Sequence, residues 1–237
     1  MSIIKTIFLI CFLSISGLFS QIVYKVRCSP RIEVIKQDKK ILKDTVLSIL
    51  VLDNVDTFIL KGNVIITDML INSGLIIISE NSRLIVHNRE NRAQIINYSN
   101  GTILNKGILS SDIILCNDAK IISENGLITT QNMLMERLSS LTMYSSHLYT
   151  TLIVISGSII CLSNKSVVSA ESLFSMNNIL TAVSLDESES IIRIKGKIDI
   201  LDGHFCINKN LKLEICENII IDDKINDQLT VINKKCD

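Results

Sequence analysis

Short apolar runs separated by polar turn residues fill the chain from about residue 45 onward. Among them are SILVLDN, LIIISEN, RLIVHN, DIILCND and KIISEN. Each run has the length of a strand and is bounded by Asn, Asp, Gly or Ser, which adopt tight turns easily, so each predicts a short β-strand. The best helical candidate, TQNMLMERLSSL at residues 130–141, is short and stands alone.

The spacing of similar segments indicates an internal repeat. The tripeptide Ser-Glu-Asn at residues 79–81 recurs at residues 123–125, and consecutive cysteines in the set Cys116, Cys161 and Cys206 are 45 residues apart. Both spacings are about twice 22 residues, a period typical of solenoids. We therefore expect coils of about 22 residues with two or three parallel strands each, stacked so that successive coils share one aliphatic core.

Residues 97–109, NYSNGTILNKGIL, suit either a hairpin or a corner of such a coil. Asn-Gly is a favoured hairpin turn. In the solenoid interpretation Asn100-Gly101 turns the chain, residues 102–104 form a strand and residues 105–107 turn it again. We favour the corner because similar segments follow along the chain. A leucine-rich-repeat solenoid is the alternative fold, since residues 138–148 match its spacing once.

The composition agrees with an aliphatic, all-β protein. Of 237 residues, 47% are hydrophobic but only 4% are aromatic, and there is no Trp. Ile and Val are β-branched, and such side chains pack well on pleated surfaces. So few aromatic residues also argue against a groove that binds sugars mainly by stacking.

The N-terminal twenty residues, MSIIKTIFLICFLSISGLFS, have the pattern of a secretory signal peptide. Lys5 precedes an apolar run at residues 7–13, and small residues suit cleavage after Ser16 or Ser20. The alternative is an uncleaved anchor, although the run is shorter than the roughly 20 residues of a membrane span. We expect a signal peptide at 1–20, a basic segment and cap at 21–44, and a β-solenoid at 45–237, in a secreted, extracellular protein.

A secreted chain permits disulfides and glycans. Cys216 and Cys236 lie 20 residues apart, about one coil, and we expect them to bridge neighbouring coils. By contrast, cysteines two coils apart would be separated by about 10 Å, too far for a disulfide. No Cys or His spacing suits a metal, and we expect no cofactor. Sequons mark Asn97, Asn100 and Asn164 as candidate glycosylation sites.

The charge pattern gives one candidate contact surface. The 24 basic and 24 acidic residues balance, so there is no reason to invoke nucleic acid. The N-terminal segment is locally basic, and a polyanion such as a glycosaminoglycan is a candidate partner for Lys36, Lys39, Lys40 and Lys43. The three histidines, His87, His147 and His204, share no spacing, and each is expected at the surface or at a strand edge.

The passage NGTILNKGILSSDIILCNDAKIISENGLI, residues 100–128, resembles coils of secreted right-handed parallel β-helix proteins, the pectate-lyase-like architecture, and of large adhesins built on it. The resemblance covers roughly residues 45–232 and implies a right-handed parallel β-helix. Small Ile- and Asn-rich secreted chains of this size also resemble microsporidian spore-wall proteins. This weaker similarity implies a place in a wall.

Polygalacturonase-type enzymes of this fold resemble one another in paired aspartates, a Gly-His-Gly and an Arg-x-Lys. This chain has residues of the same kinds in a different order, and Phe205 follows the histidine: Arg193-Ile-Lys195, Asp202-Gly203-His204 and Asp222-Asp223. GxSxG, HExxH and GxGxxG motifs are absent. We therefore expect a non-enzymatic structural or adhesive protein of a cell wall, spore wall or surface layer. It would contact wall polysaccharide, other surface proteins or its own copies. The alternatives are a carbohydrate-active β-helix enzyme and a glycosaminoglycan-binding module.

Overall fold

A computed structural model describes residues 32–35, 40–53, 57–176, 182–200, 211–216 and 231–234. The chain divides into two compact units after Ile32, and the strands below belong to the second unit, apart from the first residue of β1. All regular secondary structure in the described ranges is β-strand. Within these ranges no helix has the length and hydropathy needed to cross a membrane.

The described strands form two sheets, and every residue-by-residue register they define is parallel. The larger sheet has 12 strands. In spatial order they are β1 (Ile32–Ile35), β3 (Thr45–Leu52), β5 (Asn63–Asn72), β7 (Arg83–Val86), β10 (Ile108–Asn117), β12 (Leu127–Glu136), β14 (His147–Ser156), β16 (Val167–Met176), β18 (Ser190–Ile200), β19 (Leu211–Cys216) and β20 (Val231–Lys234), with β8 (Gln94–Tyr98) between β5 and β10.

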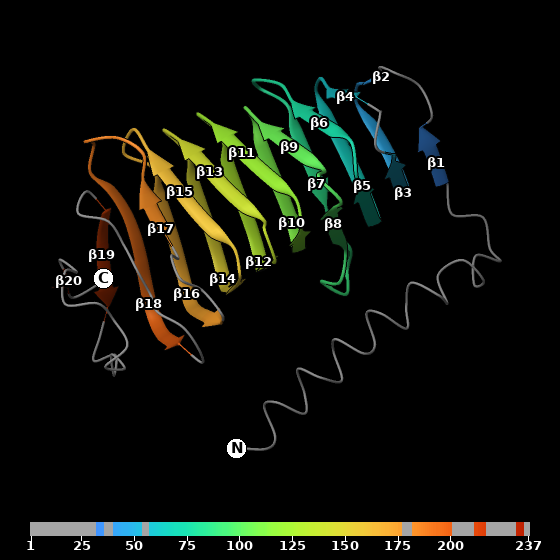
Figure 1. Cartoon of the computed structure of the whole chain (residues 1–237). Coiled ribbons are helices and arrows are strands. Elements are labelled where there is room, and N and C mark those ends of the chain that lie inside the picture. The colour runs from blue at the N-terminus through green and yellow to red at the C-terminus, as the bar shows by residue number, and fades with distance from the viewer. Residues whose placement is uncertain are drawn as a thin grey trace. The chain divides into compact units, whose positions relative to one another are not determined.

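The smaller sheet has eight strands and is made from the alternate elements of the chain. In spatial order they are β17 (Ala182–Ser184), β15 (Ile159–Ser163), β13 (Ser140–Tyr144), β11 (Lys120–Glu124), β9 (Thr102–Asn105), β6 (Leu75–Ile78), β4 (Thr57–Leu60) and β2 (Lys40–Leu42). From β1 to β18 the chain thus passes from one sheet to the other on each coil, and successive coils stack side by side (Figure 1).

This topology is a right-handed parallel β-helix of about eight turns, which confirms the fold expected from the sequence. The regular coils are slightly shorter than expected. Ile108 pairs with Leu127, which pairs with His147, which pairs with Val167, so the steps are 19 or 20 residues. The corner interpretation of residues 97–109 is also confirmed, because β9 pairs in parallel with β6 and β11 and forms no hairpin with β8 or β10.

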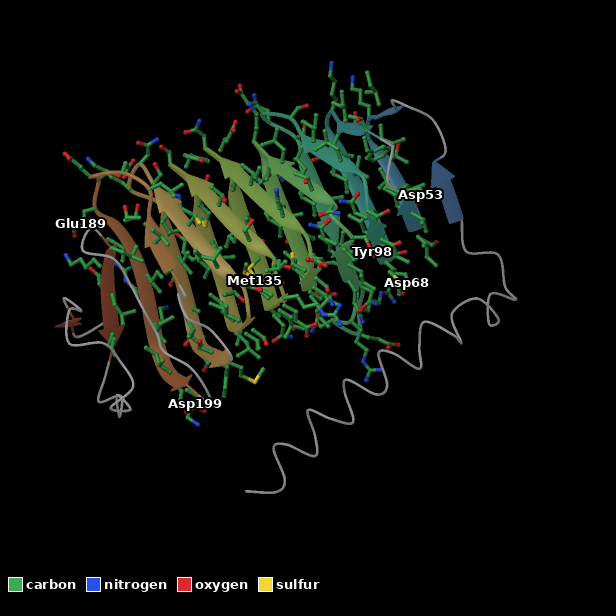
Figure 2. All side chains as sticks on the ribbon, viewed as in Figure 1. Asp53, Asp68, Tyr98, Met135, Glu189 and Asp199 are labelled. Carbon is green, nitrogen blue, oxygen red and sulfur yellow. The ribbon has the colours of Figure 1, made fainter. Side chains whose placement is uncertain are left out.

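Aliphatic side chains stack in register through the interior. One column in the larger sheet is completely buried over six coils and consists of Leu84, Leu109, Ile128, Leu148, Val168 and Ile192. Burying each such side chain stabilises the fold by about 1.5–3 kcal/mol relative to exposure. In Figure 2, side chains project from both faces of the strands, and the inward ones make a single continuous core.

The 10-residue strands change phase near their middle. In β12 the inward positions are Ile128 and Thr130 before the change and Met133 and Met135 after it, with two half-buried residues between them. The register with the neighbouring strands skips residue 131 at the same place. One long strand therefore acts as two short ones, each with its own inward face.

The helical candidate at residues 130–141 is not a helix. The segment contains the second half of β12, a turn and the start of β13. Met135, Leu138 and Leu141 follow one another at a helix-like spacing, but Leu138 is 83% exposed in the turn, next to Arg137 with φ of 52°. A turn between two strands has produced the apparent helical spacing.

Asparagine closes many of the corners. Asn81, Asn100, Asn125 and Asn164 adopt positive φ, which Asn tolerates better than most residues. Asn105, by contrast, is buried, and its side chain forms hydrogen bonds between coils. Its amide nitrogen donates to Ser123 Oγ and to the Leu127 carbonyl, both at 3.2 Å, which links neighbouring coils.

Candidate ligand-binding groove

One coil carries a loop where its neighbours carry a continuous strand. In β5 two residues separate Ile66 from Met69. Ile66 pairs with Val86 at the end of β7, and Met69 pairs with Gln94 at the start of β8. Seven residues separate Val86 from Gln94. The additional residues form the loop at 87–93, and β10 spans it by pairing with β7 and then with β8.

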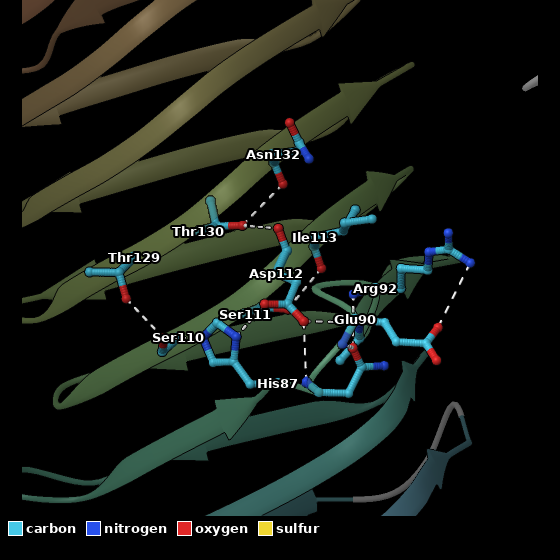
Figure 3. Close-up of polar contacts among 12 residues, drawn as sticks. His87, Glu90, Arg92, Ser110, Ser111, Asp112, Ile113, Thr129, Thr130 and Asn132 are labelled. Carbon is cyan, nitrogen blue, oxygen red and sulfur yellow. Dashed lines mark hydrogen bonds and ion pairs between the residues drawn. The ribbon is translucent and has the colours of Figure 1, made fainter.

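Asp112 lies at the phase change of β10 and anchors both ends of this loop. Its Oδ2 accepts hydrogen bonds from the backbone N–H of Asn88 (3.3 Å) and of Ala93 (3.0 Å), and its Oδ1 is bonded to Nδ1 of His87 (Figure 3). The Asp112 side chain is fully buried. Burial of a carboxylate requires such donors, because the charge has lost its hydration.

The hydrogen bonds continue from His87 into solvent-accessible space. Nε2 of His87 lies 2.9 Å from Ser110 Oγ, and Thr129 Oγ1 donates to the same oxygen at 2.9 Å (Figure 3). Because the Asp112 carboxylate can only accept, we assign a proton to Nδ1 of His87. In that tautomer Nε2 is free to accept from the Ser110 hydroxyl. The His87 side chain is 40% exposed.

The series of hydrogen bonds from Asp112 to Thr129 ends at a shallow groove of about 370 Å³ that crosses successive coils. Its walls carry hydroxyls, an amide, an aromatic ring and one carboxylate, and they are formed by His87, Ser110, Ser111, Thr129, Thr130, Gln131, Tyr149, Thr150, Thr151 and Glu171. These residues follow β7 or belong to β10, β12, β14 and β16. The groove therefore runs along the stack instead of lying within one coil.

The floor of the groove is held by its own backbone. At the phase changes, the hydroxyls of Ser111, Thr130 and Thr150 donate to the carbonyls two residues later, at 2.8–3.1 Å. Thr130 and Thr150 also donate to carbonyls of the preceding coil. These hydroxyls are therefore part of the fold, whereas Ser110, Thr129 and Gln131 occupy half-buried positions that line the groove.

A second hollow of about 730 Å³ adjoins the groove and shares Tyr149 with it. The remaining lining residues are Asn81, Ser82, Arg83, Lys106, Gly107, Ile108, Asn125, Gly126, Leu127 and His147. The Tyr149 ring lies parallel to the His147 ring to within 11°, with centroids 6.3 Å apart. Lys106 Nζ lies 2.8 Å from Glu124, whose hydrogen bond and charge raise the pKa of the lysine.

The three predicted glycosylation sites have different surroundings. Asn97 is fully buried, with its Oδ1 accepting from Asn72 (2.7 Å) and its Nδ2 donating to the Lys120 carbonyl (3.0 Å). A glycan on Nδ2 is incompatible with this position, so the expectation for Asn97 is corrected. Asn100 and Asn164 are exposed in turns, and their glycosylation stays a prediction.

The cysteine spacing does not mark equivalent positions. Cys116 lies on β10 of the larger sheet, whereas Cys161 lies on β15 of the smaller one, and both are free thiols. Burial raises the pKa of Cys116 to about 12. The predicted Cys216–Cys236 disulfide stays a prediction, since Cys236 lies outside the described residues, as does Cys206.

The basic segment is only partly described. Lys43 is exposed after β2, and Lys40 belongs to that strand. Lys36 and Lys39 lie outside the described residues, as do the expected signal peptide and its cleavage sites. Polyanion binding by these lysines stays a prediction.

Of the polygalacturonase-like set, only Arg193 and Lys195 lie within the described residues. Arg193 on β18 pairs with the buried Glu214, its Nη2 lying 2.6 Å from Oε2, and Lys195 lies 3.8 Å from Glu171. The aspartates and histidine of that set, at 202–204 and 222–223, lie outside the described residues.

Sequence reasoning missed the Asp112, His87 and Ser110 arrangement. The sequence around His87 indicates only a surface or strand-edge residue, and no motif presents a serine. Two signals could have pointed to the site. The apolar run ILSSDIIL is interrupted by three polar residues, and RLIVH is followed by the polar stretch NRENRAQ, which lengthens the coil.

Within the described residues, no group of three or more His, Cys, Asp or Glu side chains could hold a metal ion. Comparisons with family models, with curated proteins and with solved structures found no significant match.

Proposed function

We propose that this protein is a secreted structural or adhesive component of a cell wall, spore wall or surface layer, and that its groove binds an extended glycan. The observation that carries the proposal is the groove itself, whose walls come from successive coils. Neighbouring coils repeat every ~4.8 Å. The hydroxyl groups of Ser110, Thr129 and Tyr149 occupy equivalent positions of three successive coils, so they recur along the groove at this spacing. A linear polymer of hydroxyl-rich units can engage such a series of groups one after another.

The chemistry of the walls supports a weak, repeated contact. Ser110, Thr129 and Gln131 offer neutral donors and acceptors, and Tyr149, which is 49% exposed, offers one aromatic face. One ring is too little for a groove based on stacking, in agreement with the scarcity of aromatic residues. Affinity would come from many polar contacts along a polymer, as in an adhesive or wall-building protein.

Retention on insoluble polysaccharides tests this proposal. The purified full chain is incubated with chitin, cellulose and β-1,3-glucan particles, alongside the Tyr149→Ala and Gln131→Ala variants. The control is Tyr144→Ala, a half-buried tyrosine on β13 of the other sheet. We expect at least one polymer to retain the wild type and the control. The same polymer should not retain either groove variant. Equal retention of all four proteins, or none on any polymer, overturns the proposal.

A further inference from the structure

A purely structural role for the groove does not explain the hydrogen bonds that connect Asp112, His87 and Ser110. To anchor the loop at 87–93, Asp112 needs only the backbone N–H groups of Asn88 and Ala93, which bind its Oδ2. The other oxygen orients His87, and the far nitrogen of that ring reaches Ser110 at 2.9 Å. We infer that Asp112, His87 and Ser110 form a hydrolytic triad that cleaves carboxylic esters, with acyl esters on the glycan of the proposed function as substrates.

The geometry gives each group the role that ester cleavage requires. Ser110 is half-buried and lines the groove, where an acyl group can approach its Oγ. His87 accepts its proton, and Asp112 holds the ring in the tautomer with Nδ1 protonated. Asp112 is thus a positioning residue, and Ser110 and His87 are the catalytic residues.

The reaction proceeds in two balanced steps. Ser110 Oγ bonds to the acyl carbon as its proton passes to Nε2 of His87. The bond between that carbon and the alcohol oxygen then breaks, and the alcohol leaves with the proton from Nε2. Water repeats the sequence on the acyl-serine, which releases a carboxylic acid and restores Ser110.

Thr129 is the donor that we assign to the negative oxygen that develops in each step. Its hydroxyl already donates to Ser110 Oγ at 2.9 Å, beside the carbon that the serine attacks. On attack the Thr129 hydroxyl turns from Ser110 Oγ to the former carbonyl oxygen of the ester, where a hydrogen-bond donor lowers the barrier. The shallow, hydroxyl-lined groove suits a small acyl group carried by a hydrated polymer.

The test uses the full chain with two probes that need no glycan binding. A fluorophosphonate reports an activated serine, with the modified peptide identified by mass spectrometry. Hydrolysis of p-nitrophenyl acetate reports turnover. The variants are Ser110→Ala and His87→Gln, and the control is Ser169→Ala. Ser169 lies in the same register column, three coils further along.

We expect the fluorophosphonate to modify Ser110 and the acetate ester to be cleaved. The cleavage rate should fall by at least about 100-fold in both site variants and stay at the wild-type level in Ser169→Ala. Circular dichroism and the urea midpoint confirm that Ser110→Ala is folded, since it loses only one hydroxyl. Absence of labelling in the wild type, or equal turnover in wild type and Ser110→Ala, overturns the triad.

The two proposals fail separately. If acetate is cleaved and Ser110 is labelled but no polysaccharide is retained, the esterase stands and the glycan proposal falls. If a polysaccharide is retained but Ser110 is not labelled, the glycan proposal stands and the esterase falls.

Discussion

The regular coils from β11 to β16 and the longer coil from β7 to β10 differ in how deeply one position of the repeat is buried. In the regular coils, the residue skipped by the register at the phase change is half-buried or exposed: Gln131, Thr151 and Glu171. In the longer coil the equivalent residue is Asp112, and the loop at 87–93 covers it completely. The loop thus buries a carboxyl group at a position that is half-buried or exposed in the regular coils.

A buried carboxylate needs donors, and the loop that covers Asp112 supplies them. His87 is one of those donors, so its ring is fixed beside the groove. The comparison shows where chemistry arises in a repeating scaffold. Uniform coils provide a rigid surface, and a departure from the repeat creates the polar contacts that orient a reactive side chain.

A second long coil repeats this arrangement closer to the surface. Ile191 pairs with Val167, 24 residues earlier, and the turn at residues 185–189 is organised by Asp186. Its carboxylate accepts hydrogen bonds from Ser163 Oγ (2.5 Å) and from the Asn164 backbone N–H (2.9 Å). In both long coils an aspartate carboxylate joins a loop or turn to the neighbouring coil.

Truncating the core of a regular coil should have the largest effect. Leu148→Ala removes a fully buried side chain from the centre of the aliphatic column, and we expect a loss of about 3 kcal/mol in the free energy of unfolding. Urea denaturation measures it. Thr151→Ala, an exposed position on the same strand, is the control and should change stability by less than about 0.5 kcal/mol. Similar midpoints for the two variants would contradict the stacked core.

Removing the buried Asp112 carboxylate should have the second-largest effect on stability, and the effect should be confined to the loop at 87–93. Asp112→Ala leaves the backbone N–H groups of Asn88 and Ala93 without their acceptor, at a cost of about 2 kcal/mol. Hydrogen–deuterium exchange should show faster exchange at those two amides, while amides of β13 and β14 keep their protection. Unchanged exchange at Asn88 and Ala93 would show that Asp112 does not anchor the loop.

Thiol reactivity tests whether the longer coil is tightly packed beyond its loop. Cys116 lies near the end of β10, and burial raises its pKa to about 12, whereas Cys161 is half-buried in a regular coil, where burial raises its pKa as well. At pH 8 in native buffer, iodoacetamide should modify Cys161 before Cys116, and both should react readily in urea. If Cys116 reacts first under native conditions, the longer coil opens locally.

The smallest effect concerns acid stability at Asp186. Hydrogen bonds from Ser163, Ser188 and Asn164 lower the pKa of this carboxyl from its ordinary 3.8 to about 2. Because the pKa is lower in the folded state, the carboxylate stabilises the fold above about pH 4, and this contribution disappears as the pH falls to about 2. Between pH 6 and pH 3, Asp186→Asn should lose less in Tm than the wild type. Parallel pH profiles would contradict this role for Asp186.

The sequence predicted the scaffold well because strands and turns are local features. Apolar runs such as KIISEN contain their own alternation and turn residue, and stacking follows when such runs repeat. The phase change inside β12 is less visible, since the inward face shifts between Thr130 and Met133. Together with the turn after β12, it made residues 130–141 the best helical candidate in the sequence. The 45-residue cysteine spacing was a coincidence of two different sheets.

The site was harder to predict because its contacts depend on register. His87 meets Asp112 and Ser110 across 25 and 23 residues, a distance set by the length of the loop at 87–93. A one-residue change in coil length would turn each side chain to the opposite face. The polar interruption Ser110-Ser111-Asp112 marks the strand, but only the fold shows which histidine faces it.

The tautomer of His87 tests the site most directly. In ¹⁵N-labelled protein at neutral pH, the imidazole nitrogen shifts show which ring nitrogen carries the proton, and the His87→Gln, His147→Gln and His204→Gln variants assign the three histidines. We expect His87 to be protonated at Nδ1, facing Asp112, with Nε2 unprotonated toward Ser110. A His87 ring with its proton on Nε2 would contradict the arrangement from which the triad is inferred.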